Sequence, residues 1–218
     1  MSINRITIAT IGFVMLWGMC VSSVIGQQGP ERTIKQNPAV IQYNGDMANL
    51  LSHLPNVYER TIGLEVDPRQ PRSTVGFYLE KPSLADVLNA ITKSAPIYRW
   101  SEKGEFIEVA PVAGSSPLLE TPIRSFRVDY ADETEAIVQL MNLPEVQAGM
   151  NAMRLRYRDP LSAPPDSTTG AGKKMSFTLQ NVTLRQVLNK IANENGSRFW
   201  VMQRNGAGLF SIVIGSKG

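Results

Sequence analysis

An internal repeat constrains the fold of this sequence more than any single motif does. Residues 75–100 align without a gap on residues 175–200, at an offset of 100 positions. Aligned apolar residues predict a shared core in both copies: Phe77, Leu79, Leu84, Leu88, Trp100, Phe177, Leu179, Leu184, Leu188 and Trp200. We therefore expect two copies of one folding unit.

The repeat extends upstream with a different spacing. Residues 51–57 align on residues 140–146 at an offset of 89, and Leu64 and Val66 then align on Met153 and Leu155. The change from 89 to 100 requires 11 additional residues in the second copy. We place them in residues 159–173, whose proline, glycine, serine and threonine content is typical of a loop.

Both copies show the same order of structural signals. Apolar residues alternate over 75–79 and 175–179, which predicts strands, and Ser83 and Thr183 then precede helical apolar stripes as N-caps. A hairpin follows in each copy, at Lys103-Gly104 and at Asn205-Gly206. Upstream, each copy predicts a strand (39–43, 123–128), a helix and a short strand (62–66, 153–157).

The predicted fold class is therefore α+β, with two tandem β-α-β-β-α-β-β domains. We expect the first domain over residues 39–111 and the second over residues 121–216. Residues 112–120 have the composition of a linker.

Residues 1–26 have the layout of a signal peptide: Arg5, an apolar run and a tail of small residues. Cleavage near Gly26 predicts a periplasmic or secreted protein, with residues 27–38 as an N-terminal linker. The alternative is an uncleaved inner-membrane anchor, which would be the chain's only contact with a membrane. Removing 26 of the 218 residues leaves 192, without the single cysteine, Cys20, and lowers the net charge from +3 to +2.

This composition excludes several functions. A chain without cysteine has no disulfide and no thiolate chemistry, and a net charge of +2 is too small to indicate a nucleic-acid partner. His53 is the only histidine, and no motif places an acid or a nucleophile beside it, so we interpret it as a surface or boundary residue. We expect no enzyme activity, no catalytic residues, no cofactor and no metal.

Three further groups of residues invite a functional interpretation. Asp129, Asp132, Glu133 and Glu135 form an acidic cluster, which the preference of carboxylates for a helix N-terminus already explains. Residues 170–174 superficially resemble a phosphate-binding loop, but they lack its first glycine and its Ser or Thr. Arg154, Arg156 and Arg158 alternate along a predicted strand, so they would share one face, which is either an ordinary solvated surface or a site for an anion or partner.

The segments SLADVLNAI and TLRQVLNKI, with YRW and RFW before the hairpins, give the chain its family resemblance. The repeat resembles the short N-terminal (STN) domain that precedes secretin channels and some TonB-dependent receptors. The resemblance implies periplasmic docking and oligomerisation domains rather than enzymes. Neither a barrel-forming segment nor a receptor plug follows the second copy, so we expect a free-standing envelope interaction protein.

The resemblance further implies a component or accessory of a secretion, pilus or outer-membrane transport machine. Its partners would be envelope proteins, or other copies of the chain through self-association. The alternative is a binding module for cell-wall glycan or another anionic polymer, which would use the three arginines.

Overall fold

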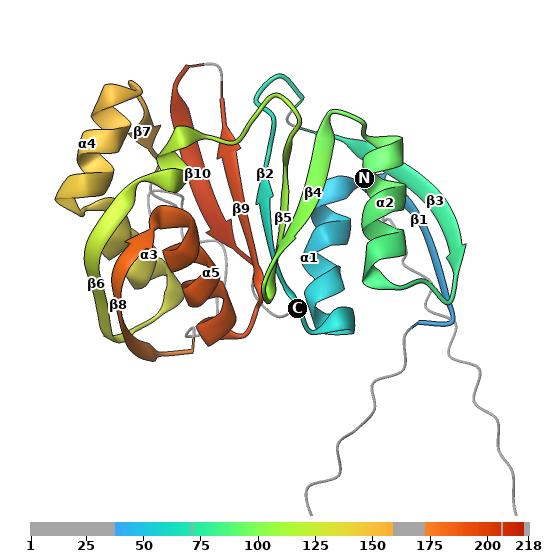
Figure 1. Cartoon of the computed structure of the whole chain (residues 1–218), viewed down its shortest axis with the longest axis horizontal. Helices are drawn as coiled ribbons and strands as arrows, with labels where there is room; N and C mark the ends of the chain where they lie inside the picture. Colours follow the sequence, from blue (N-terminus) through green and yellow to red (C-terminus); the bar gives the residue numbers. More distant parts are fainter. Residues whose placement is uncertain (1–37, 71, 159–172, 206, 216–218) are drawn as a thin grey trace, which may run out of the picture.

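The computed structural model describes residues 38–70, 72–158, 173–205 and 207–215, and these form an α+β fold (Figure 1). The expected signal peptide and the linker as far as residue 37 lie outside the described residues. The first copy has the expected order of elements: β1 (Val40–Asp46), α1 (Met47–Tyr58), β2 (Thr61–Glu65), β3 (Thr74–Glu80), α2 (Leu84–Ser94), β4 (Tyr98–Lys103) and β5 (Phe106–Pro111).

The second copy follows a short 3-10 helix, η1 (Pro117–Glu120), and has one more helix than expected. Its elements are β6 (Pro122–Ala131), α3 (Glu133–Met141), α4 (Pro144–Ala152), β7 (Arg156–Tyr157), β8 (Met175–Thr183), α5 (Leu184–Asn195), β9 (Phe199–Arg204) and β10 (Leu209–Ile214).

Capping boxes fix the starts of three helices. The side chains of Ser83, Asp132 and Thr183 each accept a hydrogen bond from the backbone three residues on. In each helix the side chain of that third residue accepts a hydrogen bond in return from the backbone N–H of the cap residue. These contacts satisfy backbone N–H groups that have no partner inside the helix.

The strand expected over residues 153–157 is mostly wrong. Residues 144–152 form α4, and the strand is only β7, Arg156–Tyr157. Pro144 occupies the first turn of α4, where its missing N–H costs nothing, and Leu143 before it is extended. The aligned Pro55 lies inside α1, so the same Leu-Pro pair continues one helix and separates two others. Part of the extra length of the second copy is therefore helical and does not lie in the loop over residues 159–173.

The two copies share one six-stranded sheet, in the order β4-β5-β2-β9-β10-β7. The first three strands come from the first copy and the last three from the second. The copies are joined where β2 runs parallel to β9, with Ile62 opposite Phe199 and Leu64 opposite Val201. We expected a separate small sheet in each domain, and this sheet instead crosses the boundary between them.

A half-turn relates the two copies. β9 is the counterpart of β4, which runs antiparallel to β5, whereas β9 runs parallel to β2 and therefore parallel to β5. The second copy is thus turned upside down within the sheet, and its helices lie on the opposite face. Accordingly, α1 contacts β2 and β9 from one side and α5 contacts the same strands from the other.

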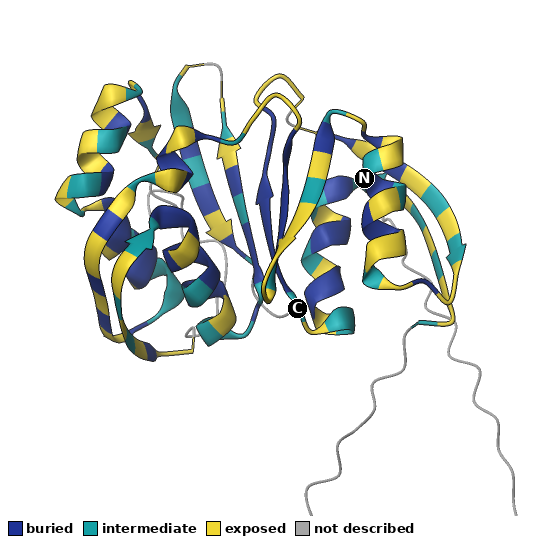
Figure 2. Ribbon diagram, viewed as in Figure 1, coloured by how far each residue is buried: buried dark blue, intermediate teal, exposed yellow. Residues whose placement is uncertain are grey.

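Two small sheets complete the layers. β1 pairs with β3 outside α1 and α2, and β6 pairs with β8 outside α3 and α5 (Figure 1). Figure 2 shows the buried positions gathered on the central strands and on the inner sides of the helices. Each pair of helices therefore lies between the shared sheet and a two-stranded sheet of its own copy.

Trp200 and Gly63 make the closest contact of the junction. Trp200 on β9 is 0% exposed, and its ring lies against Gly63 of β2. A Cβ atom at position 63 would lie 2.4 Å from the nearest ring carbon, which is closer than atoms can approach. The junction between the copies therefore requires glycine at this position.

The segment expected as a linker is also part of the core. Leu118 and Leu119 of η1 are both 0% exposed, and η1 contacts α5. Residues 117–120 thus belong to the hydrophobic core of the second copy, whereas a solvated linker buries no apolar surface.

We predict that Gly63→Ala lowers the free energy of unfolding by about 2 kcal/mol, because the new methyl group forces Trp200 or β2 to move. Chemical denaturation measures this change. Gly76→Ala is the matched control, because its added Cβ would meet no atom closer than 3.6 Å. Equal effects of the two substitutions would contradict the proposed role of Gly63.

Candidate functional site

A buried polar cluster lies beside the junction of the copies. Glu65 at the end of β2 is 4% exposed, and its carboxylate accepts hydrogen bonds of 2.6 Å from the Ser116 N–H and from the Ser115 hydroxyl. The cluster therefore attaches the segment between the copies to the shared sheet, through a carboxylate that is nearly inaccessible to water.

Arg185 at the start of α5 extends this cluster. Its Nε lies 2.9 Å from a carboxylate oxygen of Glu120 and 3.3 Å from one of Glu108, and its guanidinium also donates to Ser115. The repeat places Ala85 at the equivalent position of the first copy. Sequence reasoning missed this cluster, although an arginine directly after the first helical leucine, where the other copy has alanine, was a visible signal.

Burial raises the pKa of Glu65 above its ordinary value of 4.5. The hydrogen bonds from Ser115 and Ser116 and the charges of Arg185 and Arg204 oppose this shift, but desolvation is the larger effect. The folded protein therefore binds a proton at Glu65 more readily than the unfolded chain does.

At one end of the shared sheet, β4 has an open edge. The Val112 N–H donates to the Ile97 carbonyl, so Ile97 directs its backbone groups toward β5. In an antiparallel pair every second residue of a strand does so, and Arg99 and Ser101 are therefore hydrogen-bonded to β5 as well. The N–H and C=O groups of Trp100 and Glu102 then face outward. β9, the counterpart of β4, has this same edge covered by β2.

The side chains along the β4 edge are also more exposed than their counterparts along the β9 edge. The Trp200 indole donates to the Asn189 side chain at 2.7 Å, and the Trp100 indole donates to the Asn89 side chain at 3.0 Å. Asn189 is buried and Asn89 is exposed. The same local structure is therefore closed in the second copy and solvent-accessible in the first.

A hollow of about 340 Å³ adjoins the open edge on the other face of β4. Arg99, Ser101 and Lys103 of β4 line it together with Arg185 and Glu120. Lys103 also forms an ion pair of 2.9 Å with Glu108. Basic groups thus border the edge on this face.

The three arginines singled out from the sequence lie at the opposite end of the sheet. Arg156 and Arg158 are exposed on either side of Tyr157. Their backbone N–H groups donate hydrogen bonds to the carbonyls of Gly208 and Phe210, respectively. Arg154 is exposed in a turn with φ of 52°, so it does not continue the strand. Only two of the three arginines therefore share the alternation that the sequence predicted.

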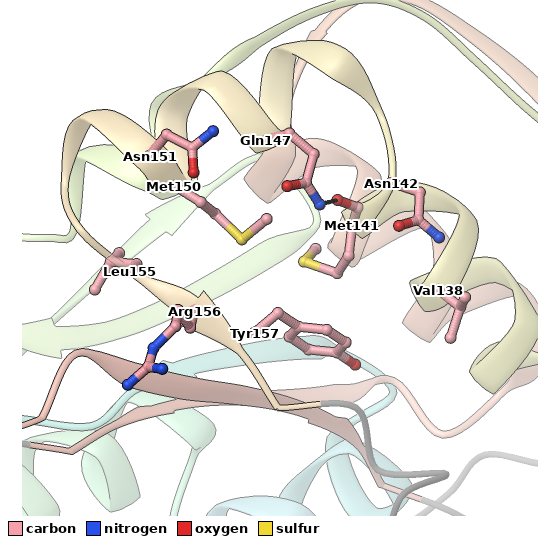
Figure 3. Close-up of a pocket in the computed structure, with 9 residues that line it drawn as sticks. All are labelled: Val138, Met141, Asn142, Gln147, Met150, Asn151, Leu155, Arg156 and Tyr157. Atoms are coloured by element: carbon pink, nitrogen blue, oxygen red, sulfur yellow. Dashed lines mark hydrogen bonds between the residues drawn. The ribbon is translucent and has the colours of Figure 1, made fainter.

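Beside β7, a cavity of about 350 Å³ lies between α3, α4 and the strand (Figure 3). Met141 and Met150 project toward it above the Tyr157 ring, and the Gln147 side chain donates to the Met141 carbonyl at 2.8 Å. The guanidinium of Arg156 points away from the Tyr157 ring. Thioether, aromatic and amide groups thus line the cavity together.

The remaining candidate residues have local roles. His53 is exposed on α1. Asp132 caps α3, and Lys174 forms ion pairs with Asp132 and Glu135 at 3.1 and 2.8 Å. Burial raises the pKa of Glu133, which accepts a hydrogen bond from Asn195. The acidic cluster is therefore occupied by helix capping and by Lys174.

Residues 170–172 of the glycine-lysine segment lie outside the described residues. The structure describes only Lys173 and Lys174 of this segment. Among the described residues, no group of three or more His, Cys, Asp or Glu side chains is arranged to hold a metal ion. Over the same residues, no helix combines the length and the apolar character needed to cross a membrane.

Comparisons with known protein families, with curated protein sequences and with solved structures find no match to this chain.

Glu65 predicts a specific pH dependence of stability. Its pKa is raised in the folded state, so its contribution to the free energy of unfolding falls as the pH rises from about 4.5 through the folded-state pKa. Glu65→Gln removes this titration. The wild type should therefore gain stability relative to the variant on acidification from pH 7 toward that range, as measured by urea denaturation at each pH. Parallel pH profiles of the two proteins would contradict the assignment.

Proposed function

We propose that this chain is a non-catalytic protein–protein interaction component of the bacterial periplasm, working with a secretion, pilus or outer-membrane transport machine. The leader-like first 26 residues and the resemblance to secretin-type short domains support this location and role. The chain binds partner proteins through the exposed edge of β4.

One observation carries this proposal. The edge of β9 is completed by a strand of the other copy, whereas the equivalent edge of β4 presents its backbone groups to solvent. An exposed edge of this kind binds an extended segment of another protein through main-chain hydrogen bonds. The other strand of the hairpin and helix α2 already hold β4 in place.

A photo-crosslinking residue at position 102, whose backbone lies on the open edge, should capture a partner in intact cells. The same residue at Gln42, which is exposed on the outer sheet of β1 and β3, is the control and should capture much less. Mass spectrometry of the adducts identifies the captured proteins. Recovery of no adduct, or of the same adducts from both positions, would contradict the proposal.

A second candidate function is binding of cell-wall glycan or another anionic polymer at β7. It is favoured by the two exposed arginines on this strand and by the neighbouring cavity, which has amide groups and an aromatic ring of the kind that bind sugars.

Charge reversal tests this second function. The double variant R156E/R158E should lose retention on immobilised peptidoglycan, because repulsion replaces attraction at both positions. The wild type and the variant R99E, which reverses one charge at the far end of the sheet, should be retained alike. Unchanged retention of the double variant would exclude polymer binding at β7.

A further inference from the structure

The junction of the two copies shows how this fold binds a strand. β2 lies parallel to β9, with Gly63 opposite Trp200, Ile62 opposite Phe199 and Leu64 opposite Val201. The glycine receives the indole ring on one face. On the other face, the residues on either side of the glycine meet the residues on either side of the tryptophan.

On β4 the tryptophan is kept and its neighbours are changed. The Trp100 indole donates a hydrogen bond to Asn89 of its own copy, as the Trp200 indole does to Asn189. The positions of Phe199 and Val201 are taken by Arg99 and Ser101, with Lys103 next on the same face. The β4 edge thus keeps the tryptophan against which a glycine of an added strand would pack. It presents positive charge to the residues on either side of that glycine.

We propose that the β4 edge binds an extended acidic segment of a partner protein, running parallel to β4, with glycine opposite Trp100 and acidic residues on both sides of it. The acidic side chains lie on the face that carries Arg99 and Lys103. Glu108 and Glu120 on this face already pair with Lys103 and Arg185, whereas Arg99 is exposed. This inference rests on the proposed function and specifies its ligand.

A second copy of the chain does not fit this edge. Continuing the sheet in the same way would place β7, the counterpart of β2, against β4 of the next molecule. On the face of Trp100, β7 would then present Arg156 and Arg158, because Tyr157 between them packs inward on Phe210, whereas β2 presents Gly63 to Trp200. The described part of this strand therefore offers no glycine to Trp100, and a different partner must supply it.

Three synthetic peptides of about eight residues, the length of an ordinary strand, test the proposal. They are identical except for a central Glu-Gly-Glu, Lys-Gly-Lys or Glu-Val-Glu. Isotope-labelled full-length protein should bind the first peptide at least tenfold more tightly than the other two, with NMR shift changes in β4 and at the Trp100 indole. Binding should weaken at about 0.5 M salt, which screens exposed charges.

Two protein variants separate charge from backbone pairing. Arg99→Glu should reverse the preference, so that the Lys-Gly-Lys peptide binds more tightly; this gain of binding does not arise from misfolding. Glu102→Pro removes an edge N–H without removing a hydrogen bond to β5 and should reduce binding at least tenfold. Glu102→Ala, which also loses the ion pair with Arg60, is its matched control and should bind normally.

Equal binding of the three peptides, shift changes away from β4, or an unchanged preference in Arg99→Glu would overturn the inference. The proposed function is tested independently of this ligand, because it predicts in-cell adducts at position 102 whatever the sequence of the partner. Adducts at position 102 with proteins that lack an acidic segment around glycine would leave the function standing and exclude this ligand.

Discussion

The pairing of β2 with β9 is the interaction on which the rest of the structure depends. It turns two three-stranded sheets into one and gives α1 and α5 opposite faces of the same two strands to cover. Trp200 restricts the residue opposite it on β2 to glycine, because its ring occupies the space that a side chain at position 63 would need. Two units of modest size thereby share a sheet whose centre is covered on both sides, which increases the apolar surface that each unit buries.

The polar cluster beside this pairing fixes how the copies are connected. Glu65, Glu108 and Arg185 come from three different elements and are all nearly inaccessible to water. Buried charges are tolerated only where partners compensate them, so the geometry of the connecting segment is closely specified. Ser115 links the two halves of the cluster, since it donates to Glu65 and accepts from Arg185. The connection between the copies is therefore a rigid part of the molecule.

Much of the fold could be predicted from the sequence because the repeat gave each pattern twice. The caps at Ser83 and Thr183 and the hairpins at Gly104 and Gly206 are local signals, and the helices and strands around them lie where they were predicted. The extra helix α4 could not be predicted in this way, since the Leu-Pro pair that starts it also occurs inside α1.

The shared sheet could not be predicted either. Strand alternation shows which face of β2 is buried, but it does not show which strand lies beside it. The sequence shows Gly63 only as a glycine within a strand, and its contact with Trp200 depends on the pairing of the two copies. The polar cluster depends on residues that lie 120 positions apart, Glu65 and Arg185. The open edge of β4 follows only once the order of all six strands is known.

The half-turn between the copies has a consequence for the size of the assembly. A unit that adds its successor by a half-turn along a sheet has no geometric reason to stop, and such a contact generates a fibre when every copy is alike. Here the copies have diverged at the contact itself, with Phe199 and Val201 on the inner strand and Arg99 and Ser101 on the outer one. The outer strand therefore does not repeat the apolar contact that Phe199 and Val201 make with β2, so the described sheet does not offer the same junction a second time.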